Sequence, residues 1–198
     1  MSDAALDVWA ERAVRSVLAL DPLSELPRTG WLLRGVRPCE SIADHSFGVA
    51  LVTMLLVDGA RASGLEVDGE RALRMAIVHD APEARLGDVP MPVKSPALDQ
   101  ELARVERSLV EVLLGDRSLA LWDELEAGRT LESRIVRVAD KAHMMLKALS
   151  YERAGRGRLD EFWGNPKTFD SRGLAAADAL FDAICAAAGR HRPTATTV

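Results

Sequence analysis

Four residues of types that bind divalent metals occur where the sequence is otherwise apolar. His45 lies at the start of the segment ESIADHSFGVALVTMLL, His79 and Asp80 end the apolar run in LRMAIVHDAPE, and Asp140 interrupts RIVRVADKAHMML. Two imidazoles and two carboxylates suit a six-coordinate divalent metal that keeps open positions for water and a substrate oxygen. Such a metal lowers the pKa of bound water and so provides a nucleophile near neutral pH. The pattern therefore predicts a hydrolytic metal centre.

These residues come from three separate segments, so the site requires helices that converge inside a bundle. Neighbouring His79 and Asp80 diverge by about 100° on a helix, and both reach one cation only if the cation lies between helices. Glu83 follows His79 by four residues and would share its helix face. A buried carboxylate without a partner is costly, and one shared cation would remove that cost for Asp80 and Asp140 together.

Apolar spacing and capping residues predict helix after helix, with no alternating pattern typical of a strand. Ser41 and Thr130 are predicted N-caps, and Ser95-Pro96 is typical of a helix start. The predicted helices cover about residues 4–20, 42–62, 70–85, 96–114, 119–126, 131–154 and 172–188. The helix over 42–62 is apolar on most sides, which is typical of a central helix. We therefore predict an all-α fold, a single-domain helical bundle.

One domain is expected over residues 1–190, with its core at about 26–163. Residues 191–198 have nothing to bury and are predicted to form a disordered tail. The segment GDVPMPVKSP is predicted to be a loop, because its three prolines and glycine exclude a helix or a central strand.

Composition excludes several functional classes. The 198-residue chain has 25 Lys plus Arg against 30 Asp plus Glu, a formal net charge of −5 at pH 7. This balance argues against a nucleic-acid polymer as partner, because such affinity depends on basic residues that neutralise phosphates. Two cysteines, Cys39 and Cys185, exclude a disulfide framework and a four-cysteine zinc site. The N-terminal segment lacks a signal-peptide pattern, and the longest apolar stretch, near Val49–Val57, is too short to span a bilayer. We therefore expect a cytoplasmic protein with no membrane partner.

The order of His45, His79-Asp80 and Asp140 resembles that of the HD-domain metal-dependent phosphohydrolases. Five further segments extend the resemblance: PRTGWLLRGV, ESIADHS, VHDAPEARLGD, LWDELE and VADKAHMMLKALSYE. They follow one another as in the YfbR-like 5′-deoxynucleotidases and are most similar to the branch called HD domain-containing protein 2. The resemblance covers roughly Leu26–Trp163, and it implies an HD-fold helical bundle.

The resemblance implies an enzyme that removes the 5′-phosphate from (deoxy)nucleoside monophosphates. It also implies that Glu83 and Asp88 are catalytic and that Trp31 packs at the sugar, where it disfavours a 2′-hydroxyl. In the bacterial form an arginine that holds phosphate precedes this tryptophan, whereas here Gly30 occupies that position and Arg28 is the nearest arginine. Other candidates for phosphate binding by position are Arg34, Arg37 and Lys94.

One divalent metal ion is expected. The resemblance points to cobalt or manganese, and the donor set is also compatible with zinc, iron or nickel. Binuclear HD enzymes place additional histidines before the last aspartate, and Ala81–Ala139 contains none, which favours a mononuclear centre. His143 is interpreted as a histidine at the edge of the core rather than a ligand. Relatives are commonly dimers, so a homodimer is expected.

Two other functions are compatible with the same residues. One is hydrolysis of nucleoside triphosphates or of one modified nucleotide, and the released product would distinguish it. The other is a non-catalytic module that binds metal and nucleotide. The second is disfavoured because binding alone does not require Glu83 and Asp88 beside the metal ligands.

Overall fold

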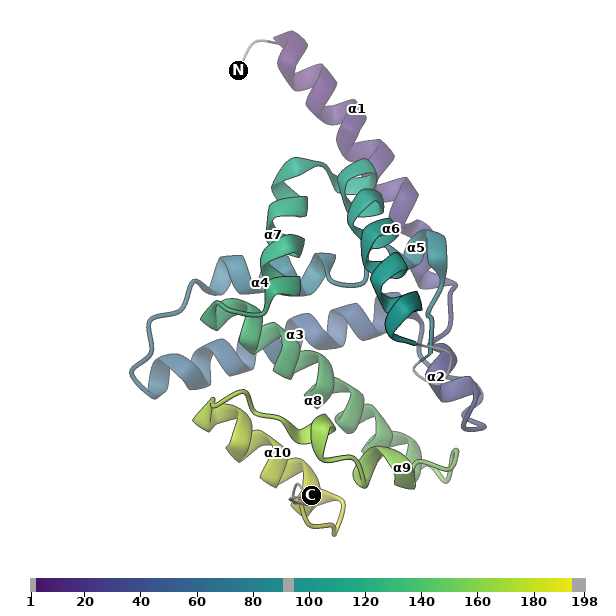
Figure 1. Cartoon of the computed structure of the whole chain (residues 1–198), viewed down its shortest axis with the longest axis vertical. Helices are drawn as coiled ribbons and strands as arrows, with labels where there is room; N and C mark the ends of the chain where they lie inside the picture. Colours follow the sequence, from purple (N-terminus) through teal and green to yellow (C-terminus); the bar gives the residue numbers. More distant parts are fainter. Residues whose placement is uncertain (1–2, 91–94, 194–198) are drawn as a thin grey trace.

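The computed structural model describes residues 3–90 and 95–193, and it shows a bundle of α-helices (Figure 1). The helices are α1 Asp3–Leu20, α2 Thr29–Leu32, α3 Ile42–Ala62, α4 Gly69–Val78, α5 Glu83–Leu86, α6 Pro96–Leu114, α7 Asp116–Ala127, α8 Leu131–Arg153, α9 Asp160–Trp163 and α10 Ala175–Ala187. Two short 3₁₀ helices, η1 Asp21–Ser24 and η3 Pro166–Phe169, connect them. The described part of the chain has no β-strand, only an isolated bridge between Pro27 and Ser41. The prediction of an all-α single-domain bundle is confirmed.

The centre of the fold is the contact between α3 and α8, with α4 packed on both. Val49, Ile135 and Met145 are fully buried in this core. The apolar stretch Val49–Val57 is too short to cross a membrane, but the whole of α3, at 21 residues, is long and apolar enough by length and composition alone. Nine of its residues are nevertheless buried in the bundle, which is typical of a core helix.

A capping box at Ser41 begins α3 and thereby sets the position of His45. The Ser41 hydroxyl accepts a hydrogen bond from the Asp44 amide at 3.1 Å, and the Asp44 carboxylate accepts one from the Ser41 amide at 2.9 Å. These bonds satisfy backbone donors that have no partner inside the helix. His45 then lies in the first turn of α3 with 1% of its surface exposed. The predicted boundaries of this helix, 42–62, are confirmed.

The predicted helix over 70–85 is wrong in its second half. The Asp68 side chain caps α4 at its start, but α4 ends at Val78, and a turn over 79–82 separates it from the short α5. Pro82 has no amide hydrogen to donate to the preceding turn, so a continuous helix would lose a bond there. His79 and Asp80 therefore lie on a turn.

Two other helix starts differ from the prediction. The helix predicted at 119 begins at Asp116, directly after Gly115. The helix predicted at 172 begins at Ala175, because Gly173 has a φ of +72°. The predicted tail continues from His191 after α10, and its residues 194–198 lie outside the described residues.

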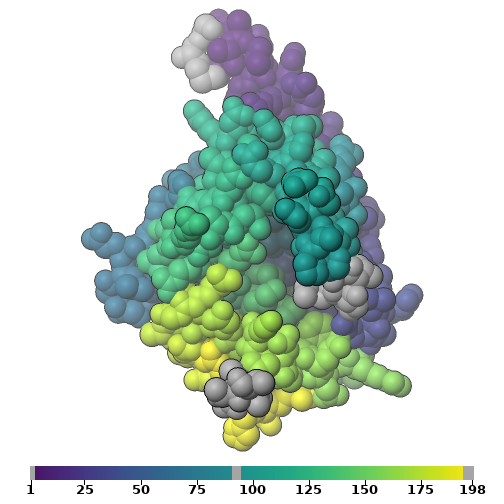
Figure 2. All heavy atoms as spheres, viewed as in Figure 1, coloured from purple at the N-terminus to yellow at the C-terminus, as the bar shows by residue number. Residues whose placement is uncertain are grey.

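Helix α1 projects from the rest of the molecule (Figures 1 and 2). It has no buried residue, and its larger contacts in the described chain are with α6 and η1. The Ser16 hydroxyl donates to the Leu113 carbonyl at 2.7 Å and so attaches α1 to α6. Large apolar side chains remain exposed along it: Leu6, Val8, Trp9, Val14, Val17 and Leu18.

Candidate active site

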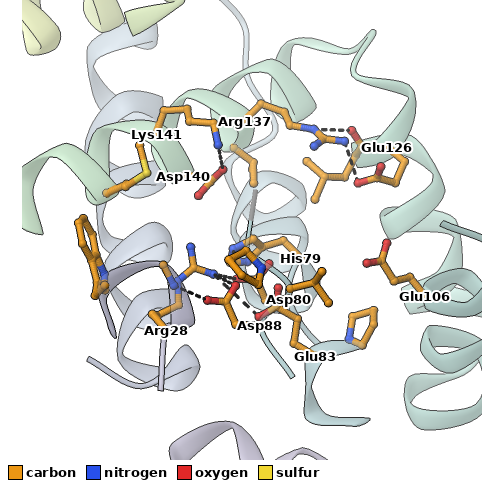
Figure 3. A pocket seen from close by; sticks show the side chains of 18 of the residues that line it. Arg28, His79, Asp80, Glu83, Asp88, Glu106, Glu126, Arg137, Asp140 and Lys141 are labelled. Atoms are coloured by element: carbon orange, nitrogen blue, oxygen red, sulfur yellow. Dashed lines mark hydrogen bonds and ion pairs between the residues drawn. The ribbon is translucent and has the colours of Figure 1, made fainter. Parts of the chain in front are cut away.

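A pocket of about 350 Å³ lies where the turn after α4 faces α2 and α8. Its walls come from α2, the segment 79–90, α6, α7, α8 and α9. Figure 2 shows a hollow between α6 and the surfaces of α7 and α8, and Figure 3 shows the polar side chains that point into the pocket. The helix break at Pro82 explains why residues 79–90 line the pocket. It turns the chain so that this segment passes along one wall.

Three of the predicted metal ligands offer donor atoms within 4.8 Å of one another: His45, His79 and Asp140. His45 Nε2 lies 3.3 Å from Asp140 Oδ1 and 3.7 Å from Asp80 Oδ2. The same Asp80 oxygen lies 3.1 Å from His79 Nε2. The structure thus brings together all four predicted ligands, from α3, the turn after α4, and α8.

The two imidazoles present free lone pairs to this cluster. His79 Nδ1 lies 2.7 Å from the Ala76 carbonyl oxygen, and only a protonated nitrogen can donate to it. In the neutral ring Nε2 is then unprotonated. The Nε2 atoms of His45 and His79 are both buried without a hydrogen-bond partner in the described residues. Two orphaned imidazole nitrogens facing two carboxylates fit a divalent metal ion.

The carboxylates of the cluster are ionised. Burial raises the pKa of Asp140, but the Lys141 ammonium and the imidazoles of His45 and His79 outweigh it and hold that pKa well below its usual range. Burial likewise opposes the charge of Asp80, and His79 and Arg28 lower its pKa below the usual value. Conversely, burial lowers the pKa of His79, and the charge of Asp80 outweighs it and raises that pKa. The two ionised carboxylates are therefore suited to bind a cation.

Arg28 lies among carboxylates rather than at the surface (Figure 3). Its Nη1 atom is 3.4 Å from Asp80, 3.6 Å from Asp88 and 3.9 Å from Glu83. Burial lowers the pKa of the guanidinium, but the surrounding carboxylates outweigh burial and raise it. Arg28 is thus a fixed positive charge in the pocket, next to the predicted metal ligands.

The two predicted catalytic carboxylates have different surroundings. Glu83, the first residue of α5, has a buried Oε2 atom with no hydrogen-bond partner in 3–90 or 95–193. Burial, with the charges of Asp80 and Asp88, raises the pKa of Glu83 to about 9. Asp88 instead accepts a hydrogen bond from the Gly30 amide at 3.3 Å and lies beside Arg28. Glu83 therefore retains a proton at neutral pH in the metal-free protein.

The raised pKa of Glu83 predicts a pH-dependent stability of the metal-free chain. Between about pH 4.5 and about pH 9, folded Glu83 binds a proton that the unfolded chain releases, so the free energy of unfolding falls as pH rises. Relative to Glu83→Gln, which cannot titrate, the wild type should lose at least about 1 kcal/mol over this range. Urea unfolding at both ends of the range, in the presence of a chelator, measures the difference. Equal pH profiles for the two proteins would contradict the assignment.

The other predicted substrate contacts are placed unequally. Trp31 lines the pocket with 3% of its surface exposed, and its indole nitrogen donates to Glu40 at 2.8 Å. Arg34 also lines the pocket, stacks on Phe162 at 5.2 Å and pairs with Glu161. Arg37 is exposed and is not among the described residues that line the pocket, so the structure does not bring it to the site. Lys94 lies outside the described residues.

Sequence reasoning missed the contribution of α8 beyond Asp140. Lys141 lies with its Nζ atom 3.1 Å from Asp140 Oδ2 and lines the pocket, as do Arg137 and Met144. Arg137 donates to Glu126 of α7 at 2.7 Å (Figure 3). The helical spacing of three and four residues around Asp140 was the available signal for Arg137 and Met144.

His143 is buried and lies behind the cluster. Its Nδ1 atom lies 3.1 Å from Nδ1 of His45, the nitrogen that faces away from the two aspartates. Burial, and then the neighbouring His45 and Lys147, lower the pKa of His143 to about 3, so its ring is neutral.

Together these features define a helical bundle with a His–Asp cluster at a pocket that charged side chains line. The chain belongs to the HD domain family, whose profile matches residues 20–176. The resemblance predicted from the sequence motifs is thereby confirmed.

Individual relatives agree with this family. The chain is 34% identical over 152 residues to the 5′-deoxynucleotidase HDDC2 of Xenopus laevis, which covers 72% of each protein. It is 31% identical to the 5′-deoxynucleotidase hdd1 of Schizosaccharomyces pombe, over 76% of this chain and 79% of that protein. Its fold is similar to the crystal structure of the PH0347 protein from Pyrococcus horikoshii, with a TM-score of 0.75, 37% identity, and coverage of 89% and 98%.

Proposed function

We propose that this protein is a metal-dependent phosphohydrolase that removes the 5′-phosphate of deoxyribonucleoside monophosphates. The main support for this proposal is the arrangement of residues at the pocket. Two buried imidazole nitrogens, without hydrogen-bond partners in the described part of the chain, face two ionised aspartates, and Glu83 and Arg28 lie beside them. Binding alone does not require a carboxyl group with a raised pKa at this place. The similarity to proteins named 5′-deoxynucleotidase supports the substrate class.

The residues proposed to hold the metal are His45, His79, Asp80 and Asp140. A divalent ion bound there would polarise a phosphate oxygen and would lower the pKa of a bound water molecule to near neutral pH. Cobalt or manganese is our proposal for the ion, and zinc, iron and nickel are compatible with the same donors.

The protein's own residues supply the remaining steps. Arg28 and Lys141 lie on opposite sides of the cluster and are placed to neutralise the charge of the phosphate (Figure 3). Water attacks phosphorus and the bond to the 5′-oxygen breaks. Because burial keeps Glu83 protonated, Glu83 can donate its proton to the leaving 5′-oxygen, and the carboxylate so formed then takes the proton of the attacking water. Asp88, which contacts the Gly30 amide and Arg28, holds α2 and the guanidinium in place.

Phosphate release from a panel of nucleotides tests this function. The metal-stripped protein would be mixed with each dNMP, NMP and dNTP, with Mn²⁺, Co²⁺, Mg²⁺ or Zn²⁺ added in turn. We expect phosphate from dNMPs and much less from NMPs. Pyrophosphate or triphosphate from dNTPs would instead identify a triphosphate hydrolase. No product under any condition would contradict catalysis on these substrates.

Trp31 should determine the preference for deoxyribose. Its ring is held rigidly between Tyr151 and Phe162, with ring centroids 5.3 and 4.9 Å away, and such a wall can exclude a 2′-hydroxyl. Trp31→Ala should reduce the ratio of kcat/KM for dAMP to that for AMP by about tenfold or more. The ratio is independent of how much protein is active. The control is Trp163→Ala, because Trp163 is a buried tryptophan that is not among the described lining residues of the pocket. An unchanged ratio in Trp31→Ala would show that Trp31 does not contact the sugar.

We further propose that the protein is a cytoplasmic homodimer that uses α1. Six large apolar side chains are exposed on α1 in the described chain, and an isologous contact between two copies would bury those on one face of the helix.

A charge on this face should separate the two copies. Trp9 and Val17, which are 62% and 70% exposed, can be replaced without disturbing the core. Trp9→Glu with Val17→Glu should halve the mass measured by light scattering, because two like charges would be buried across the contact. The substitution Glu11→Ala on the same helix is the control. A wild-type mass of one chain, 21.5 kDa, would contradict the dimer.

A further inference from the structure

Two buried residues outside the predicted site, Glu40 and His143, lie between the metal cluster and the wall of the pocket. Glu40 is 5% exposed and His143 is 9% exposed. Glu40 precedes α3 and His143 lies on α8, so they connect the two central helices of the bundle (Figure 1). Neither points into the pocket as a lining residue among those described. Burial of a carboxylate costs free energy, so the buried position of Glu40 requires a specific explanation.

The proton positions on the rings of His45 and His143 follow from hydrogen-bond chemistry. His45 offers Nε2 to the cluster, so in the neutral ring the proton is on Nδ1. His45 Nδ1 lies 3.1 Å from Nδ1 of His143, and one of the two nitrogens has to accept. His143 Nδ1 is then the acceptor, and the proton of the His143 ring is on Nε2.

The carboxylate of Glu40 favours this arrangement. Its Oε2 atom lies 3.9 Å from His143 Nε2, too far for a hydrogen bond but close enough for its charge to favour a proton there. That oxygen is buried and has no hydrogen-bond partner in the described chain, although Lys147 Nζ lies 3.7 Å away. Its other oxygen, Oε1, accepts from the indole of Trp31 at 2.8 Å. Room for the His143 ring exists only because residue 48 is glycine, since a Cβ there would lie 1.9 Å from Nε2.

We propose that Glu40 and His143 are positioning residues that hold His45 in the tautomer able to bind the metal and at the same time fix Trp31. The proposal rests on the metal centre of the proposed function and not on the identity of the nucleotide. One carboxylate thus connects the metal ligand to the pocket wall. Loss of a residue that orients a metal ligand in this way typically lowers metal affinity by about 10- to 100-fold.

The variant Glu40→Gln separates the effect of Glu40 on the metal ligand His45 from its effect on Trp31. A glutamine keeps an oxygen for the Trp31 indole, but it turns an N–H group toward His143. The negative charge that favoured a proton on His143 Nε2 is then lost and an N–H dipole faces that nitrogen, so the His143 proton is favoured on Nδ1, opposite His45. His45 in turn must carry its proton on Nε2 and loses the free lone pair. The variant His143→Asn retains an acceptor for His45, whereas His143→Leu does not.

Metal affinity and tautomer state can be measured without substrate. The Co²⁺ dissociation constant, from chelator competition on the full chain, should rise about 10- to 100-fold in Glu40→Gln and His143→Leu. It should change much less in His143→Asn. Nitrogen-15 spectra of the metal-free protein should show His45 protonated on Nδ1 in the wild type and on Nε2 in Glu40→Gln. The Trp31 indole signal should remain. Met145→Leu, a buried volume-conserving change on the same helix, is the control.

Several outcomes would overturn the proposal. Wild-type affinity in Glu40→Gln and His143→Leu would exclude the positioning role. Equal losses in His143→Asn and His143→Leu would show that the acceptor atom is irrelevant. Loss of the Trp31 signal together with affinity would indicate a general disturbance of the fold instead. A protein that shows the expected pattern of metal affinity but hydrolyses none of the nucleotides would refute the proposed function alone.

Discussion

Asp140→Ala should lose metal and activity together. Asp140 is the α8 donor of the cluster, 3.3 Å from His45 Nε2, and its carboxylate is held in the ionised form. Without it, Co²⁺ affinity should fall by more than about 100-fold, because loss of a direct ligand has a larger effect than loss of a residue that only orients a ligand. Turnover should fall below about one-thousandth of the wild-type rate, since the water would no longer be activated near neutral pH. Chelator competition and phosphate release measure the two losses in one preparation.

The control is Asp123→Ala, which removes an aspartate of α7 paired with Arg107 at 2.9 Å, away from the pocket lining. It should retain both metal and activity. If Asp140→Ala bound Co²⁺ as tightly as the wild type, the cluster would not be the metal centre. The location of the site would then have to be reconsidered.

Glu83→Gln should separate the two properties by abolishing activity while metal remains. Glutamine has the shape of glutamate but cannot take or give the proton. We expect turnover to fall by about 10²- to 10⁴-fold, the usual contribution of a general acid or base. Glu83 is not one of the four proposed ligands, so Co²⁺ affinity should stay within about threefold of wild type.

Glu126→Gln is the matched control for this change. Glu126 lines the same pocket and pairs with Arg137, but it lies apart from the cluster (Figure 3). It should leave turnover nearly unchanged. Full activity in Glu83→Gln would transfer the proton-handling role to another group, with Asp88 the first to replace. Loss of metal in Glu83→Gln would make Glu83 a ligand instead.

The parts of the fold that could be predicted from sequence depend on local interactions. Ser41 and Thr130 cap α3 and α8 as their residue types indicate, and Ser95 caps α6 before Pro96. Such signals act within one turn of chain, so a single segment reveals them. The convergence of His45, His79-Asp80 and Asp140 was also predictable, because polar groups in apolar segments need a common partner.

The remaining features depend on pairs far apart in the chain. Nothing near Glu40 indicates that it meets His143 of α8, and the interpretation of His143 as a residue at the edge of the core understated its contact with His45. The break of the helix at Val78 was missed because the apolar spacing continues across it. Arg37, chosen by its position in the sequence, is exposed and does not line the pocket in the described structure.

The charges that line the pocket imply an order of events. Among the described lining residues are six carboxyl groups and four lysine or arginine side chains, and with Glu83 protonated the formal excess is one negative charge. A 5′-monophosphate is itself close to a dianion at neutral pH. Its entry into the metal-free pocket would place like charges together, and the carboxylates would compete for Arg28. The pocket therefore has to acquire its cation before the nucleotide enters, and binding of the two is expected to be sequential and synergistic.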